Sequence, residues 1–235
     1  MTMYAARLGS YHFGLSKELP ESELSKIIGA LKKPIAAPKR VLGGRGQIST
    51  TELEGVGSVV IKHYKRGGFL RYLGLSRYLR FGPTRPEREY DYLQKVLAAG
   101  VQVPEPIGFV YEGSIFYKGW LITKRVESEQ SLAEISVSDP PRARKLVLSL
   151  AQQITRLIEE RIYHVDLHAG NVLVDPQDNL FLIDFDKAIP FKGTRNKLRD
   201  QYLFRWRRAV IKHQLPEILS ELVCSEVRRN YDNVK

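Results

Sequence analysis

The chain has 235 residues, and its 43% hydrophobic and 27% charged residues are ordinary for a globular protein, which excludes global disorder. The formal net charge of +11 predicts an anionic partner, such as a nucleotide, nucleic acid, an acidic or phosphorylated sugar, or anionic lipid. The single cysteine, Cys224, excludes an intrachain disulfide. The N-terminus carries no apolar signal core, and no apolar run approaches the roughly 20 residues that span a bilayer. Any membrane role is therefore expected to be peripheral.

The first part of the chain is expected to be an amphipathic segment over residues 1–38, closed by Pro34 and Pro38. A glycine-dense turn follows at residues 41–47. Its glycines are Gly43, Gly44 and Gly46. Glycines let backbone N–H groups approach phosphates closely. Their spacing departs from G-x-G-x-x-G, however, and also fits a plain hairpin turn.

A short β-branched strand is predicted at residues 59–62, ending on Lys62. Residues 63–86 are basic, aromatic and rich in glycine, which favours an irregular insertion. A helix then begins at Thr84, whose side chain is expected to cap it, with Glu87 completing a capping box. Gly100 is its expected end.

Two glutamates on this helix have different expected roles. Glu89 shares a face with Leu93, Val96 and Leu97, so it points toward the core. Glu87 caps the helix instead. Glu89 is therefore the inward-facing carboxylate.

Further along, residues 115–117 and 120–123 predict a strand pair around Lys118-Gly119. A helix capped by Asp139 is predicted next, with apolar residues at helical spacing from 146 to 158. The apolar strands 172–174 and 180–183 then form a hairpin through Asp-Pro-Gln-Asp-Asn. The remaining chain is predicted to be helical and basic.

This order of elements predicts an α+β protein with two lobes and a cleft between them. Residues 1–126 form an N-lobe with an antiparallel sheet, and residues 127–235 form a small, mostly helical C-lobe.

The run from His164 to Asp184 carries the chemistry. His164-Val-Asp166-Leu-His-Ala-Gly-Asn171 matches the kinase pattern H-x-D with Asn five residues after the Asp, and Asp184-Phe-Asp186 follows one hairpin later. Phosphoryl transfer needs a carboxylate that orients the attacking hydroxyl and accepts its proton, which Asp166 supplies. It also needs hard oxygen ligands for Mg²⁺, which Asn171 and Asp184 supply. His164 is expected to brace the loop, and His168 is expected to have no role.

The N-terminal half offers partners for this loop. Lys62 is expected to bind the α- and β-phosphates of ATP, and Glu89 to pair with it. The remaining candidates for the nucleotide site are hinge and base-packing positions: Thr123, Lys124, Val126, Leu173 and Ile183. Leu173 and Ile183 would serve equally well as core residues.

Several segments together resemble the small kinases of the lipopolysaccharide core, in particular the 3-deoxy-D-manno-octulosonic acid (Kdo) kinases. The segments are Lys62-His-Tyr-Lys-Arg-Gly-Gly68, Arg88-Glu89-Tyr-Asp-Tyr-Leu93, Val103-Pro-Glu-Pro106, Leu121-Ile-Thr123 and the run ending in Asp-Phe-Asp. The resemblance covers roughly residues 43–213. The Arg-Gly-Gly after the strand lysine and Asp186 in place of the DFG glycine are typical of this group and not of ordinary protein kinases.

The resemblance implies a protein-kinase-like two-lobed fold and transfer of the ATP γ-phosphate to the 4-OH of Kdo on a lipid A precursor. It also implies a peripheral location at the cytoplasmic face of a Gram-negative inner membrane. In this light the basic insertion is expected to bind the anionic acceptor or the membrane surface, although a solvated face fits it equally well. Its candidate residues are Lys65, Arg66, Arg71 and Arg77.

Other functions remain open on the residues alone. Heptose kinases, aminoglycoside phosphotransferases and RIO-like atypical protein kinases share H-x-D-x-x-x-x-N. A basic, non-catalytic kinase-like binding protein is a further alternative, although the full set from Lys62 to Asp184 argues against it. No nucleic-acid recognition motif is visible, and nucleic acid is not expected as a partner.

Overall fold

The computed structural model describes residues 3–36, 47–64 and 78–233. The described chain divides into two compact units. The first contains residues up to 93, apart from the undescribed stretches, and residues 105–125. The second contains residues 94–104 and 126–233.

The first unit is built on an antiparallel sheet with eight strands among the described residues. The strands are β1 (Tyr4–Leu8), β2 (Tyr11–Leu15), β3 (Ile35–Ala36), β4 (Gln47–Leu53), β5 (Gly57–His63), β6 (Tyr78–Leu79), β7 (Pro106–Glu112) and β8 (Phe116–Lys124). Their order is β1-β2-β7-β8-β5-β4-β3, and β6 pairs with β8. Residues 3–36 are thus not a single amphipathic segment, contrary to the prediction for residues 1–38. Instead, β1 and β2 form a hairpin that joins the sheet through β7.

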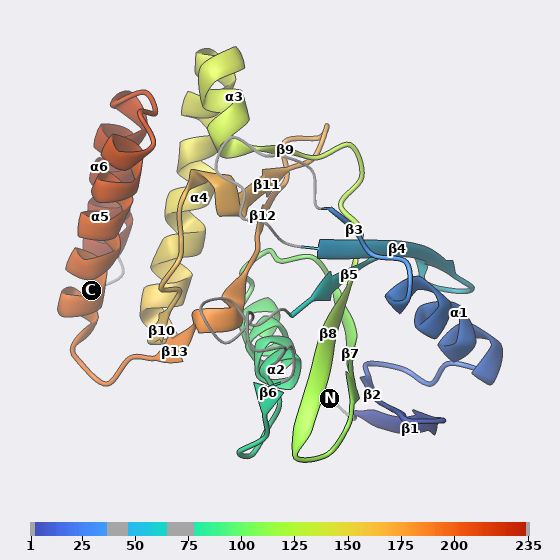
Figure 1. Ribbon diagram of the computed structural model, residues 1–235. Coiled ribbons are helices and arrows are strands. Elements are labelled where there is room, and N and C mark those ends of the chain that lie inside the picture. The colour runs from blue at the N-terminus through green and yellow to red at the C-terminus, as the bar shows by residue number, and fades with distance from the viewer. Residues whose placement is uncertain (1–2, 37–46, 65–77, 234–235) are drawn as a thin grey trace. The chain divides into compact units, whose positions relative to one another are not determined.

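Helix α1 (Glu21–Leu31) covers part of this sheet (Figure 1). Its buried residues Leu24, Ile27 and Leu31 recur at helical spacing, and they pack into the same core cluster as the sheet residues Leu53 and Ile61. The amphipathic pattern of this helix therefore supplies one wall of the core.

The strand arrangement around Lys118-Gly119 differs from the prediction. Residues 116–124 form one continuous strand, β8, and its partner is β7. The turn lies at Gly113, whose φ of +105° requires glycine. Gly119 is instead a site of close approach, since a Cβ there would lie 2.8 Å from the Pro86 side chain.

Helix α2 (Arg85–Ala98) has the predicted punctuation. The Thr84 backbone N–H donates to Glu87 Oε2 at 3.0 Å and the Glu87 N–H donates to Thr84 Oγ1 at 3.4 Å, which confirms the capping box. Gly100 ends the helix with φ of +78°. Its N–H donates to the Leu97 carbonyl, and the next N–H donates to the Val96 carbonyl, as in a Schellman motif. Leu97 itself is exposed, contrary to the predicted apolar face.

The second unit is mostly helical. Its helices are α3 (Leu132–Ser138), α4 (Pro140–Glu159), α5 (Arg195–Lys212) and α6 (Ile218–Asn233). Its strands are β9 (Gln130–Ser131), β10 (Ile162–Tyr163), β11 (Val172–Val174), β12 (Leu180–Leu182) and β13 (Ile189–Pro190), with 3-10 turns η2 (Ala169–Asn171) and η3 (Phe185–Lys187). The Asp139 cap and the β11–β12 hairpin are confirmed. Together the two units confirm the predicted α+β fold.

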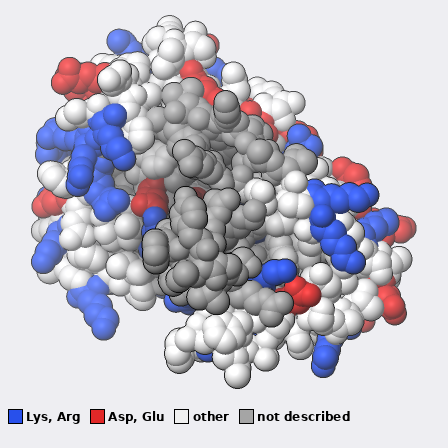
Figure 2. Space-filling model, in the orientation of Figure 1, with Lys and Arg blue, Asp and Glu red and all other residues white. Residues whose placement is uncertain are grey.

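Helices α4, α5 and α6 pack together in the core of the second unit (Figure 1). The apolar stripe of α4 is buried, as its spacing predicts. Trp206 of α5 is buried too, and its indole N–H donates to the Leu219 carbonyl at 3.2 Å. The exposed side of α5 is basic, and Figure 2 shows a group of Lys and Arg side chains over the α5–α6 region. Within the described residues, no helix combines the length and apolar character needed to cross a membrane.

Candidate active site

The first unit contains a buried lysine–glutamate ion pair. Lys62 Nζ lies 3.0 Å from Glu89 Oε1 and 2.8 Å from Glu89 Oε2. Glu89 is only 2% exposed, whereas a third of the Lys62 side chain (33%) remains accessible. Strand β5 lies between β4 and β8, so Lys62 is not a solvated lysine on a sheet edge. A buried carboxylate needs a nearby cation, so the pair satisfies Glu89 and fixes the direction of the Lys62 side chain.

Tyr64 is a member of this site that the sequence prediction missed. Its buried hydroxyl donates to Glu89 Oε2, and its ring lies 5.1 Å from Lys62 Nζ. The signal in the sequence was the two-residue spacing of Tyr64 from Lys62, because residues two apart along an extended segment lie on the same side. Tyr64 therefore holds Glu89 from a second direction.

The contact between α2 and β8 sets the position of Glu89. Pro86, in the first turn of α2, packs where Gly119 has no side chain. The helix can therefore approach the sheet closely, and Glu89 lies one turn further along. The buried residues Tyr90 and Leu93 secure the same side of the helix.

In the second unit, His164 braces the catalytic loop. Its Nε2 lies 2.9 Å from the Ile183 carbonyl, so this nitrogen carries the proton and donates. Its Nδ1 is buried with no hydrogen-bond partner among the described residues. Burial lowers the pKa of His164, so the ring is neutral near pH 7. The ring also packs 4.4 Å from that of the fully buried Phe185.

Tyr202 of α5 fastens the helix to the strand that precedes the loop. Its hydroxyl donates to the Ile162 carbonyl at 2.8 Å and accepts from the His164 backbone N–H at 2.8 Å. Burial raises the pKa of this hydroxyl, so it keeps the proton that it donates. The register of α5 against the loop is thereby fixed.

Asp166 is the partly exposed carboxylate of the loop, and two cations flank it. Lys187 Nζ lies 2.7 Å from its Oδ2, and Arg205 Nη2 lies 3.7 Å from its Oδ1. The hydrogen bond to Asp166 raises the pKa of Lys187, which stays an ammonium. Sequence reasoning gave neither cation a role at Asp166, although Lys187 directly follows Asp184-Phe-Asp186.

Asn171 and Asp184 are the two predicted metal ligands. The side-chain N–H of Asn171 donates to the Asp166 carbonyl at 2.9 Å, which leaves its amide oxygen as the atom able to bind a cation. The backbone carbonyl of Asn171 accepts from the Ile183 N–H at 3.0 Å. This bond brings the start of the Asp184 segment beside the loop. Asp184 has φ of +68°, a left-handed conformation that Asp tolerates better than most residues.

The donor chemistry fits Mg²⁺, which prefers oxygen ligands and keeps several waters or phosphate oxygens. Among the described residues, no group of three or more His, Cys, Asp or Glu side chains is arranged to hold a metal without such added oxygens.

His168 has a structural position in the loop. Its Nδ1 accepts from the Gly170 N–H at 3.1 Å, so it caps the η2 turn, and its ring lies 5.8 Å from that of His213. Burial lowers the pKa of His168. It therefore has a local role, which the sequence prediction did not assign.

The predicted nucleotide-binding positions that the structure describes lie in or shortly after strands β8, β11 and β12. Thr123 and Lys124 end β8, where they pair with Val60 and Val59. Leu173 is buried in β11, and Ile183 follows β12. Val126 is partly buried in the second unit. Their contact with adenine stays a prediction, and Gly43, Gly44, Gly46, Lys65, Arg66, Arg71 and Arg77 lie outside the described residues.

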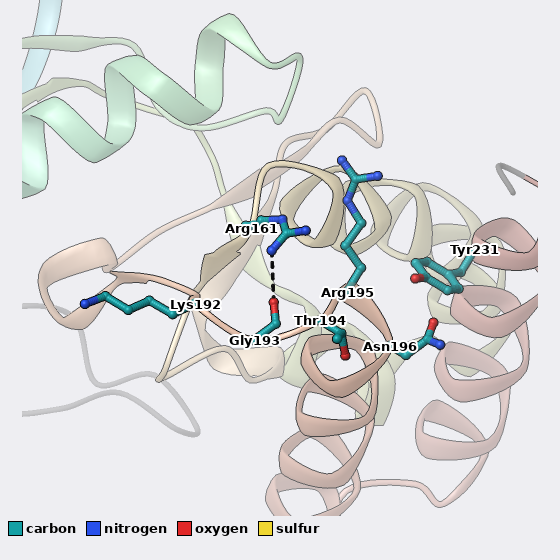
Figure 3. Close-up of a pocket in the computed structure, with 7 residues that line it drawn as sticks. All are labelled: Arg161, Lys192, Gly193, Thr194, Arg195, Asn196 and Tyr231. Atoms are coloured by element: carbon teal, nitrogen blue, oxygen red, sulfur yellow. Dashed lines mark hydrogen bonds between the residues drawn. The ribbon is translucent and has the colours of Figure 1, made fainter.

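A depression of about 450 Å³ lies at the start of α5 in the second unit (Figure 3). It is lined by Arg161, Lys192, Gly193, Thr194, Arg195, Asn196 and Tyr231. Arg161 donates to the Gly193 carbonyl and Arg195 to the Glu159 carbonyl. Lys192 points away from the other cations in Figure 3. None of the predicted site residues lines it.

Comparison with known proteins identifies the family. Residues 38–221 match the model of the lipopolysaccharide kinase (Kdo/WaaP) family. Three curated relatives are each named 3-deoxy-D-manno-octulosonic acid kinase. The protein of Vibrio vulnificus strain YJ016 is 30% identical over 67% of this chain and 68% of its own length.

The other two relatives extend the match. The protein of Xylella fastidiosa strain M12 is 29% identical over 82% of this chain and 75% of its own. That of Mannheimia succiniciproducens is 32% identical over 74% and 76%. The matched region covers most of the sequence and contains the kinase motifs described above. The chain therefore belongs to the lipopolysaccharide kinase (Kdo/WaaP) family.

Proposed function

We propose that this kinase transfers the γ-phosphate of ATP to a hydroxyl of Kdo in the lipopolysaccharide inner core, specifically the 4-OH of Kdo on a lipid A precursor. The family and the names of the relatives support Kdo as acceptor. The choice of hydroxyl and of precursor rests on the resemblance of the sequence to Kdo kinases.

The observation that carries the proposal is the Lys62–Glu89 pair. These residues are 27 positions apart, and motif reasoning paired them as the phosphate-binding lysine and its helical partner. In the structure the two side chains form a two-point ion pair of 2.8 and 3.0 Å. Such a pair must be in place for a kinase lysine to bind the α- and β-phosphates.

The residues of the second unit supply the transfer chemistry. Asp166 would orient the acceptor hydroxyl and accept its proton as the new O–P bond forms and the bond from the γ-phosphorus to the β-γ bridging oxygen breaks. The amide oxygen of Asn171 and the carboxylate of Asp184 would hold Mg²⁺. This ion, when bound, neutralises charge that develops on the phosphate oxygens. His164 would keep the loop in place and transfer no proton, because its Nε2–H is committed to Ile183.

The protein is further proposed to act as a peripheral protein at the cytoplasmic face of the inner membrane, where its acceptor would lie. The net charge of +11 supports this location. So does the exposed side of α5, where the apolar residues Phe204 and Ile211 lie seven positions apart with Arg207 and Arg208 between them.

The acceptor assignment is tested by comparing the candidate acceptors in separate reactions. The purified protein is incubated with Mg-ATP and, separately, Kdo-lipid A, heptosylated core, an aminoglycoside and a generic protein substrate. Mass spectrometry and NMR then locate the added phosphate. We expect phosphate on the Kdo 4-OH alone. Phosphorylation of another acceptor, or of another Kdo hydroxyl, would contradict the corresponding part of the proposal.

A further inference from the structure

The two cations on Asp166 contribute little to folding. The Lys187 side chain is 63% exposed and that of Arg205 is 44% exposed. Ion pairs with this exposure contribute little to stability, because water and salt screen them. Their position next to the catalytic carboxylate therefore calls for a role in the reaction.

Both cations lie on elements that buried side chains anchor. Lys187 closes the η3 turn, which is anchored by the fully buried Phe185. Arg205 lies one helical turn after Tyr202, whose hydroxyl is bonded to the Ile162 carbonyl and the His164 N–H. Because these anchors fix η3 and α5 against the loop, the two cations converge on opposite oxygens of Asp166.

The catalytic loop itself provides no cation that could take their place. The position two residues after Asp166 is His168, whose Nδ1 accepts the Gly170 N–H. The loop from His164 to Asn171 contains no Lys or Arg. Positive charge at Asp166 thus comes from Lys187 and Arg205 among the residues that the structure describes.

We infer that Lys187 and Arg205 form an anion subsite that binds the carboxylate of the acceptor sugar. This inference rests on the proposed function, because it assumes that the acceptor is a sugar acid. An acceptor hydroxyl oriented by Asp166 must come within hydrogen-bond distance of the Asp166 carboxylate. The rest of the sugar then lies beside both cations. An ammonium and a guanidinium that flank the same carboxylate can both form strong charge-assisted hydrogen bonds with an incoming carboxylate.

The subsite also gives a basis for selectivity. With no anion present, both cations interact with Asp166 and occupy the oxygens that should receive the hydroxyl proton. An acceptor carboxylate draws them toward itself and leaves Asp166 available. A neutral sugar cannot do so, and it would be phosphorylated poorly even where its hydroxyl fits.

The test compares Kdo-lipid A with an analogue whose Kdo carboxylate is reduced to the alcohol, both presented in nonionic detergent. Wild-type kcat/KM should be about 10- to 100-fold higher for the carboxylate, as expected for lost charge-assisted hydrogen bonds. The double variant Lys187→Gln/Arg205→Gln should lose most of this preference, mainly through a higher KM for Kdo-lipid A. Arg144→Gln/Lys145→Gln, which removes the same charges from exposed positions of α4, should retain it.

Each outcome has a defined meaning. If the double variant is slowed equally on both acceptors, with a higher KM for ATP, the cations serve the nucleotide phosphates and the inference is wrong. Retention of the full preference by the double variant would overturn it as well. If wild-type protein phosphorylates neither acceptor, the proposed function fails, which is a different result. Circular dichroism of each variant checks that it is folded.

Discussion

At the scale of single residues, the site depends on which polar groups are buried and with what partner. Glu89 and Glu87 are two positions apart on α2, yet one is buried against Lys62 and the other closes the capping box. Helical spacing separates these roles from the sequence alone. It could not reveal Lys187 or Arg205 at Asp166, because those contacts depend on how η3 and α5 return to the loop.

The two glutamates provide a matched pair of substitutions. Glu89→Gln removes the charge that holds Lys62, so kcat/KM for ATP should fall about 10- to 100-fold, the range for a lost charge-assisted hydrogen bond. Glu87→Gln should leave both ATP kinetics and stability almost unchanged, because glutamine also completes a capping box. Steady-state kinetics and thermal unfolding of both variants check this. Equal kinetic losses in the two would contradict the assigned roles.

His164 predicts a pH dependence of stability. Burial lowers its pKa below the ordinary value of 6.5. The unfolded chain therefore takes up a proton as pH falls through about 6.5, and the folded chain does not. Stability is fully present above that pH and declines below it, by at most about 1.4 kcal/mol per pH unit for this one group.

The comparison that isolates this effect is His164→Gln, whose amide N–H can still donate to the Ile183 carbonyl. Urea unfolding at pH 7.5, 6.5 and 5.5 should show a steeper loss of stability for the wild type than for the variant. His168 and His213, whose pKa values are also lowered by burial, contribute equally to both proteins. Parallel pH profiles would show that His164 is not buried in neutral form.

At the scale of elements, local signals predicted what local physics determines. The caps of α2 and α4 and the β11–β12 hairpin follow from side chains within a few residues of each terminus. The prediction failed where a glycine had two possible meanings. Gly119 suggested a turn but serves close packing, while the hairpin of β1 and β2 turns at Gly9, whose φ is +60°.

Gly119→Val tests the packing of α2 on β8. The new side chain would meet Pro86 within van der Waals distance and move the helix that carries Glu89. We expect a loss of stability of about 1–3 kcal/mol, as for other overpacked sites, together with weaker ATP binding. Chemical denaturation and nucleotide titration measure both.

Gly29→Ala is the matched control for this substitution. Gly29 is exposed within α1, and a Cβ there would meet nothing within 4 Å. The change should stabilise the protein by about 0.5–1 kcal/mol, because alanine loses less conformational entropy in a helix. If Gly119→Val is tolerated as well as this control, the close approach does not position α2.

At the scale of the whole molecule, one group of exposed basic side chains lies over α5 and α6 (Figure 2). The sequence predicted a basic, helical C-terminal part, and α5 shows both features. It could not say which faces remain exposed, because exposure depends on the packing of α4, α5 and α6.

The proposed membrane contact predicts salt-sensitive binding to vesicles of phosphatidylethanolamine and phosphatidylglycerol. Arg207→Glu/Arg208→Glu should weaken partitioning at least about tenfold, since each basic residue near an anionic surface contributes about 1 kcal/mol. Arg144→Glu/Lys145→Glu makes the same charge change at exposed positions of α4 and should have a smaller effect. Sedimentation with vesicles distinguishes the two. Equal weakening would mean that net charge, and not the α5 surface, determines binding.

Asp166 is proposed to orient the acceptor hydroxyl and accept its proton, while separate groups bind the nucleotide. Turnover and nucleotide binding are therefore measured on the same preparation of Asp166→Ala, with Asp184→Ala alongside. Asp166→Ala should lose turnover of Kdo-lipid A while still binding Mg-ATP with near wild-type affinity, and Asp184→Ala should lose the metal-dependent part of that binding. An Asp166→Ala protein that still phosphorylates the acceptor would contradict the account.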